Sequence, residues 1–112
     1  MALRFNTKTP KKLLTFLRGA IDDGRIVTWD YDSDGDFTHM AAQWKNKAWF
    51  RPKIVKRREL QFIILKPQNE VITSEIYAVY HGRLIEAMLA HFDNMFINAS
   101  ASPLPELGDV VD

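Results

Sequence analysis

The alternation of apolar and polar residues is clearest over Ile26–Trp44, where it predicts a β-hairpin. Residues 33–35, Ser-Asp-Gly, supply the loop, because a glycine in the left-handed conformation can close a type I turn followed by a bulge. A loop of this length aligns Trp29 with His39 and sets the register of the whole hairpin. A slip of one residue would turn the large rings outward, so we expect the register to be well determined.

In this register the larger apolar residues share one face, as a half-buried strand requires. These packing residues are Trp29, Tyr31 and Phe37. The opposite face is acidic near the tip and carries Thr28, Asp30, Asp32, Asp36, Thr38 and Met40. Directly opposed like charges, such as Asp32 and Asp36, repel unless a positive group lies between them.

Two segments follow the helical repeat. The first begins at Thr9 and Pro10, which suit the N-cap and first helical position, and ends before Gly24. Its apolar arc comprises Leu13, Leu14, Phe16, Leu17, Ala20 and Ile21. The second segment covers Ser74–Ile97 behind an N-cap at Thr73. Its apolar residues cover more than half of the helical wheel, whereas packing on one surface needs a stripe of roughly 100°.

The remaining apolar segments complete an α+β fold. Residues 48–50 begin a third strand, which Pro52 marks as an edge or irregular strand, and residues 60–65 form a central strand. We therefore expect one domain over residues 1–98: an N-terminal helix, an antiparallel sheet of three or four strands built on the hairpin, and a long C-terminal helix packed across the sheet. Residues 99–112 are expected to form a flexible acidic tail.

Composition narrows the class of protein. The 112 residues contain no cysteine, which excludes a disulfide framework, a zinc ribbon and a thiol nucleophile. The N-terminal residues lack the apolar run of a secretory signal, and no uninterrupted aliphatic or aromatic run, such as residues 62–65, is long enough to cross a bilayer. We expect a cytoplasmic protein that does not bind a membrane.

Charge is polarised along the chain although the net charge is only +1. Residues 22–36 hold six aspartates and one arginine, whereas residues 45–58 hold seven lysines and arginines and no acid. Neighbouring strands of opposite charge can neutralise each other, with each exposed pair contributing up to about 1 kcal/mol. The alternative interpretation is that one of these segments meets a partner.

The hairpin tip resembles the opening of a calcium-binding loop in its D-x-D-x-D-G spacing. The weak candidate ligands are Asp30, Asp32, Asp34 and Asp36. The bidentate glutamate that such a loop needs at its twelfth position is replaced by Ala41. We therefore favour a polar tight turn over a metal site, and we expect no cofactor.

A basic segment interleaved with rings follows the hairpin and suggests an alternative function. Single-stranded nucleic acid binders stack bases on rings while cations follow the phosphates. The residues that fit this pattern are Trp44, Lys45, Lys47, Trp49, Arg51 and Lys53.

The histidines give no catalytic pattern. His81 and His91 share the second predicted helix but lie about 15 Å apart along its axis, too far to share a metal. The sequence contains no G-x-S-x-G, P-loop, dinucleotide-binding or H-E-x-x-H motif. A small enzyme of unknown chemistry would need a pocket that sets His39 or His81 beside an acid.

The sequence favours a non-catalytic binding or regulatory module that acts through protein–protein contact, either with a second copy or with another protein. The wide apolar arc of the second helix and the polarised charge lead us to expect a homodimer that shares this helix. The expected contact residues are Asp32, Asp34, Asp36, Tyr77, Met88 and Met95.

Overall fold

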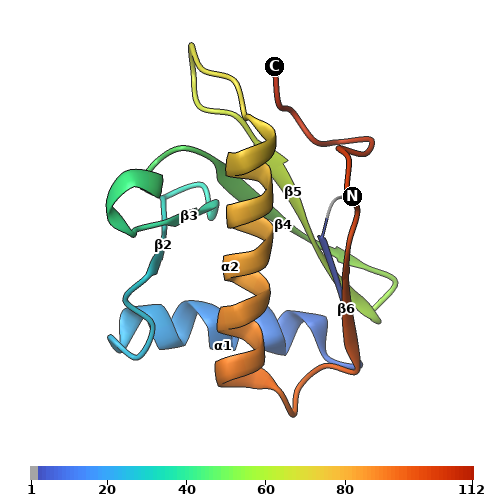
Figure 1. Ribbon diagram of the computed structural model, residues 1–112. Coiled ribbons are helices and arrows are strands. Elements are labelled where there is room, and N and C mark those ends of the chain that lie inside the picture. The colour runs from blue at the N-terminus through green and yellow to red at the C-terminus, as the bar shows by residue number, and fades with distance from the viewer. Residues whose placement is uncertain (1–2) are drawn as a thin grey trace.

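The computed structural model describes residues 3–112 and confirms the α+β class (Figure 1). The strands are β1 (Leu3–Asn6), β2 (Trp29–Tyr31), β3 (Phe37–His39), β4 (Trp49–Val55), β5 (Glu59–Leu65) and β6 (Asn98–Ala101). The helices are α1 (Pro10–Asp22), α2 (Ser74–Phe92) and a short 3₁₀ helix, η1 (Ala42–Trp44). The strands form one antiparallel sheet in the order β2-β3-β4-β5-β1-β6.

Both helices pack on the same face of the sheet. Arg18 of α1 lies over the Phe37 ring, and Tyr80 of α2 packs against Phe50, the residue paired with Phe37 on the next strand. Alternate strand residues supply this face of the core: Leu3, Phe5, Trp29, Phe37, Phe50, Leu60, Phe62 and Ile64. The helices run in different directions, with α1 crossing near the end of α2 (Figure 1).

The predicted hairpin register is confirmed, since Trp29 pairs with His39 and Tyr31 with Phe37. The hairpin is shorter than predicted, because the chain leaves the ladder after β3 and forms η1. Thr38 was expected on the outer face but is buried. Beyond Phe37 the strands β3 and β4 separate, and the Thr38 hydroxyl fills the gap by donating to Ala48 O and lying 3.2 Å from the Tyr80 hydroxyl.

Two of the predicted helix boundaries are confirmed, and one is wrong. Gly24 adopts φ +77° after α1, and the Thr73 hydroxyl accepts a hydrogen bond from Ile76 N, as expected. The prediction that α2 extends to Ile97 is wrong, because the helix ends at Phe92. Phe96 then packs edge-on against Phe5 of β1, and Ile97 N donates to Asn6 O, so contacts with β1 draw the chain out of the helix.

Two strands enlarge the predicted sheet of three or four strands to six. β1 lies between β5 and β6, and neither β1 nor β6 was expected. Strand β6 crosses the domain boundary predicted at residue 98, so residues 99–101 belong to the sheet.

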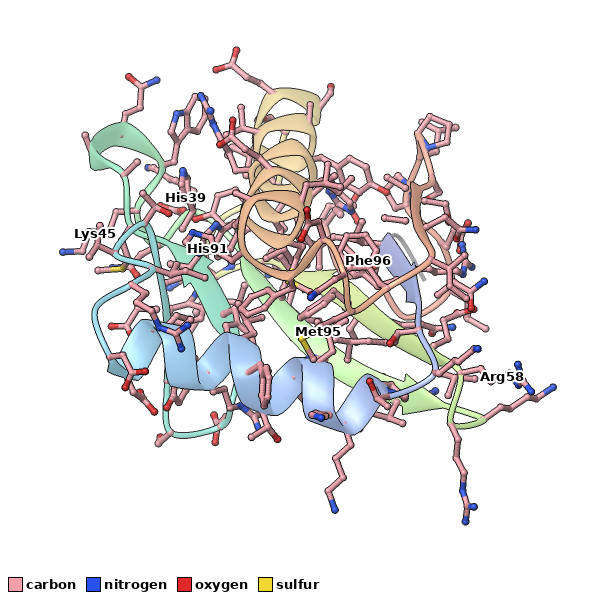
Figure 2. All side chains as sticks on the ribbon, turned by 90° about the horizontal axis from the view of Figure 1, so that it is seen from below. His39, Lys45, Arg58, His91, Met95 and Phe96 are labelled. Carbon is pink, nitrogen blue, oxygen red and sulfur yellow. The ribbon has the colours of Figure 1, made fainter. Side chains whose placement is uncertain are left out.

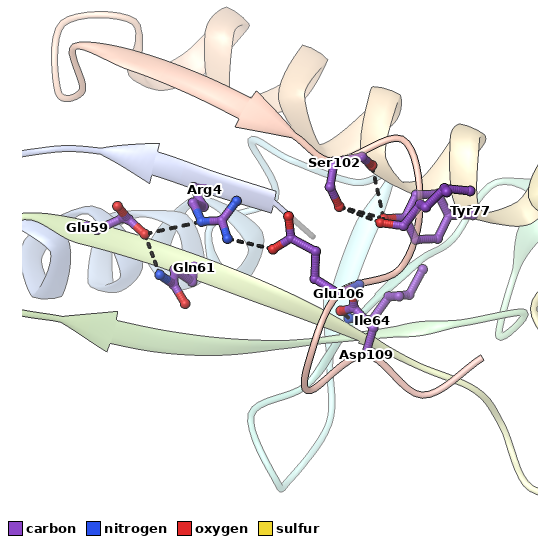
Figure 3. Close-up of polar contacts among 9 residues, drawn as sticks. Arg4, Glu59, Gln61, Ile64, Tyr77, Ser102, Glu106 and Asp109 are labelled. Carbon is purple, nitrogen blue, oxygen red and sulfur yellow. Dashed lines mark hydrogen bonds and ion pairs between the residues drawn. The ribbon is translucent and has the colours of Figure 1, made fainter. Parts of the chain in front are cut away.

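The chain after β6 contacts the fold at several points (Figure 3). Tyr77 donates from its hydroxyl to Ser102 O, and Arg4 pairs with Glu106. Asp109 accepts from Ile64 N at 3.0 Å through one oxygen and from Glu106 N at 2.8 Å through the other. The flexibility proposed for this tail stays a prediction.

We predict that Asp109→Ala lowers the free energy of unfolding by about 1–3 kcal/mol, because the fully buried Ile64 loses the acceptor of its backbone N–H. Urea unfolding followed by circular dichroism measures this loss. Asp93→Ala, at the exposed C-terminal end of α2, is the matched control and should change stability by less than about 0.5 kcal/mol. Equal losses in the two variants would contradict the anchoring role of Asp109.

Candidate functional site

The acidic hairpin tip is a closed turn held by its own carboxylates. Asp32 Oδ1 accepts hydrogen bonds from the backbone N–H groups of Asp34 and Asp36, each at 3.0 Å. Asp36 is buried and binds the Arg51 guanidinium through both oxygens, at 3.0 and 2.8 Å. These bonds raise the pKa of Arg51 above its ordinary value. Arg51 therefore supplies the positive group that the opposed aspartates need.

This geometry weakens the metal interpretation of the tip. Carboxylate oxygens of Asp32, Asp34 and Asp36 lie within 4.8 Å of one another, but both oxygens of Asp36 are bound by Arg51 and one oxygen of Asp32 is bound by backbone N–H groups. Asp30 accepts from Tyr31 N and is not part of the cluster. Turn geometry and one ion pair account for the acidic residues at this position.

The predicted nucleic acid residues are only partly brought together: Trp44 and Lys47 line one pocket near the start of α2, and the others lie elsewhere. Trp49, Arg51 and Lys53 alternate along β4 and share the face opposite the helices, but Arg51 is neutralised by Asp36. Trp44 lies in η1 and faces α2 across a cleft. The remaining two candidates, Lys45 and Lys47, lie between η1 and β4.

The predicted partner surface on α2 is covered by the chain itself. Tyr77 and Met88 lie in the core, with Met88 fully buried, and Met95 follows the helix and is half-buried. The buried residues of α2 form one stripe: Tyr77, Tyr80, His81, Leu84, Met88 and Phe92. Rings of the sheet cover this stripe, since Tyr80 packs on Trp29 and Phe50 and His81 packs on Phe50. Leu89, from the same predicted arc, is 52% exposed, and the homodimer through α2 stays a prediction.

A cleft of about 480 Å³ lies between the hairpin and α2. Trp29, Trp44 and His39 supply rings to it, and Arg83, Glu86 and His91 contribute from α2. Figure 2 shows His39 and His91 at the same end of the fold. The cleft therefore contains the histidine and the acid that an enzyme of unknown chemistry would need.

His39 is held in a defined protonation state. Its Nδ1 lies 2.8 Å from Thr28 O, and because a carbonyl can only accept, Nδ1 carries the hydrogen. Burial lowers the pKa of His39, and the nearby Arg83 lowers it further. At neutral pH the ring is therefore uncharged, with a bare Nε2.

His81 differs from His39 because it lies away from the cleft. Its Nδ1 donates to Tyr77 O at 2.6 Å, and its ring stacks on the Tyr77 ring at 4.0 Å. Burial lowers the pKa of His81. Within residues 3–112 its Nε2 is the one buried side-chain nitrogen or oxygen without a hydrogen-bond partner. No carboxylate of the described chain hydrogen-bonds to it, so His81 is a core residue.

The structure reveals a further surface along α1. Lys12, Phe16, Gly19 and Asp23 follow one line on its outer side, given their spacing of three and four residues. The sequence placed Phe16 in the buried arc, but its side chain is 44% exposed. A Cβ added to Gly19 would meet no atom within 4 Å, so the chain itself gives no packing reason for glycine here.

Charges at both ends of α1 oppose the helix dipole. The first turn contains Lys11 and Lys12 and no acid, whereas Asp22 and Asp23 stand at the C-terminal end without a basic residue in the last turn. The turn between β4 and β5 adds cations beside the N-terminal end, and Arg57 from that turn lines a groove of about 630 Å³ with the start of α1. Figure 2 shows Arg58 of the turn beyond that end.

The chain matches no protein-family profile, no curated protein and no solved structure. No helix within the described residues is long and apolar enough to cross a membrane.

We predict that the free energy of unfolding decreases as the pH is lowered below about 6.5, the ordinary pKa of histidine. The pKa values of His39 and His81 are lowered in the folded chain, so the unfolded chain binds protons there that the folded chain does not. Each histidine contributes at most about 1.4 kcal/mol per pH unit. Urea unfolding at pH 5.5 and 7.5 measures the difference. His81→Gln should reduce the difference, whereas His91→Gln, at an exposed position, is the control. A difference unchanged by His81→Gln would contradict the assignment.

Proposed function

We propose that the protein is a non-catalytic binding module that acts through protein–protein contact, and that its partner is a second copy of the chain bound through α1. The observation that carries this proposal is the outer line of α1, where an exposed Phe16 lies between a basic end and an acidic end. Each end carries the charge that its own helix dipole disfavours, so an antiparallel neighbour offers favourable partners to both.

The spacing on α1 suits an antiparallel pair of helices. When two copies of α1 lie side by side in opposite directions, Lys12 of one copy faces Asp23 of the other. In the same register Phe16 faces Gly19 of the other copy, where the missing side chain leaves room for a ring. Two-fold symmetry repeats both contacts, so the interface closes as a dimer and does not grow into a fibre.

Charges outside the helix support the same arrangement. The hairpin tip lies at the acidic end of α1, where the Tyr31 hydroxyl donates to Asp22 at 2.7 Å. The basic turn lies at the opposite end and adjoins the groove beside Pro10. In the antiparallel pair the tip of each copy approaches the basic turn of the other, which gives the acidic tip a role in partner contact.

One helix face per copy gives a small interface. Stable complexes bury roughly 1,200–2,000 Å² in total, and a single helix pair lies at or below the lower limit. We therefore expect a dimer that dissociates at micromolar concentration and weakens with salt.

The nucleic acid alternative has less support. The groove at the basic end is lined by lysines, an arginine, threonines, a proline and Ile54, with no ring on which a base could stack. The rings predicted for that function, Trp44 and Trp49, belong to different surfaces.

We predict that Lys12→Glu and Asp23→Lys each weaken the dimer at least tenfold, because each places two like-charged pairs across the interface. The double variant should restore association, since it only exchanges the two charges. Light scattering after size exclusion, at 10–500 micromolar protein and low salt, gives the mass relative to the 13.0 kDa chain.

The stability of each variant shows whether a loss of dimer could come from a loss of folding. Each single variant improves the helix dipole interaction, while Asp23→Lys also removes the exposed ion pair of Asp23 with Arg25, so stability should change by less than about 1 kcal/mol in either variant. Gly19→Leu should likewise stabilise the helix by up to about 1 kcal/mol while it blocks the ring of the partner. Lys53→Glu, on the opposite face of the sheet, is the charge-matched control and should dimerise as the wild type does. A wild-type mass of one chain at all concentrations would overturn the proposal.

A further inference from the structure

The cleft between the hairpin and α2 contains a hydrogen-bond acceptor that the dimer does not use. His39 is 4% exposed, and its Nδ1 hydrogen is committed to Thr28 O. Its Nε2 has no hydrogen-bond partner within residues 3–112. This atom is not one of the solvent-inaccessible side-chain atoms without a partner. Because His39 lines the cleft, Nε2 opens onto this space.

We propose that this cleft binds a small, uncharged planar molecule that donates an N–H or O–H hydrogen bond to His39 Nε2. Nε2 is an acceptor that solvent can reach, so a ligand that donates to it exchanges a hydrogen bond with water for a direct one, which contributes about 0.5–1.5 kcal/mol. The volume of about 480 Å³ lies within the range of small-molecule sites.

The cleft walls select a flat ligand. Trp29 lies against the His39 ring with centroids 5.0 Å apart, and Trp44 lines the same space from η1. Trp29 is 2% exposed, so it closes the floor of the cleft, whereas the half-buried Trp44 offers a ring against which a planar group can pack. Trp29 is itself fixed by an edge-on contact with Tyr80, so the wall is already formed without a ligand.

The rim selects against a net charge. Arg83 and Glu86 both line the cleft and pair with each other at 3.3 Å. Because these two charges offset each other at the rim, neither a carboxylate nor a cation gains a net charge attraction there. A neutral molecule enters without breaking this pair, while bare Nε2 favours a donor over an acceptor.

Indole and 1-methylindole test the proposal, because they share a ring system and differ in the N–H donor. Each is titrated to millimolar concentration into ¹⁵N-labelled full-length protein at pH 7.5, with the histidine ring nitrogens observed by long-range ¹H–¹⁵N correlation. We expect indole to shift the His39 Nε2 signal toward that of a hydrogen-bonded nitrogen. We also expect 1-methylindole to bind about tenfold more weakly and to leave this signal in place.

Three variants test whether indole binds in the cleft beside His39. His39→Phe keeps an aromatic ring and removes the acceptor, so it should weaken indole binding about tenfold and abolish the preference over 1-methylindole. Asp93→Ala, at an exposed position outside the cleft lining, should bind indole within twofold of the wild type. Lys12→Glu should bind indole normally, which separates this site from the proposed dimer. Equal binding of the two indoles to the wild type without a change at Nε2, or no binding at all, would overturn the proposal even if His39→Phe fails to fold.

Discussion

The hydroxyl group of Tyr80 holds together the part of the fold on which the cleft depends. It donates to Trp44 O, accepts from Lys47 N at 3.2 Å and lies 3.2 Å from the Thr38 hydroxyl, while its ring packs against Trp29. Strands β3 and β4 have already separated at this level, so no strand ladder closes the gap. A side chain from α2 thus replaces the missing backbone pairing, and it fixes the hairpin, η1 and α2 relative to one another.

The two ends of the described chain share one edge of β5. Strand β1 pairs with the first part of β5, from Glu59 to Phe62, and Val110 forms a parallel bridge to Leu65 farther along the same strand. The C-terminal segment thereby satisfies backbone groups that β1 is too short to reach, including Ile64 N through Asp109. The center of the sheet is therefore completed by residues that are distant in sequence, and α1 and α2 pack on a surface that both ends of the chain support.

Local signals in the sequence predicted the parts of the fold that depend on near neighbours. The Ser-Asp-Gly loop determined the hairpin register, and Gly24 and Thr73 marked helix boundaries, because turn and capping chemistry act within a few residues. Strands β1 and β6 have four residues each, too few for a periodic pattern to be recognised. The candidate sites were harder to predict. The exposure of Phe16 and the free nitrogen of His39 depend on where distant elements stop covering the chain, and spacing along the sequence carries no such information.

The reversed charges of α1 also affect how two molecules meet. Its N-terminal dipole end and the neighbouring cations have the same sign, as do its C-terminal dipole end and the neighbouring aspartates, so their fields add and do not cancel. The charged residues at its two ends thereby enlarge the electric moment along this one helix, in a protein whose net charge is only +1. At low ionic strength this moment orients an approaching copy before contact, over distances of about 10 Å or more, and raises the association rate without adding any contact to the final complex.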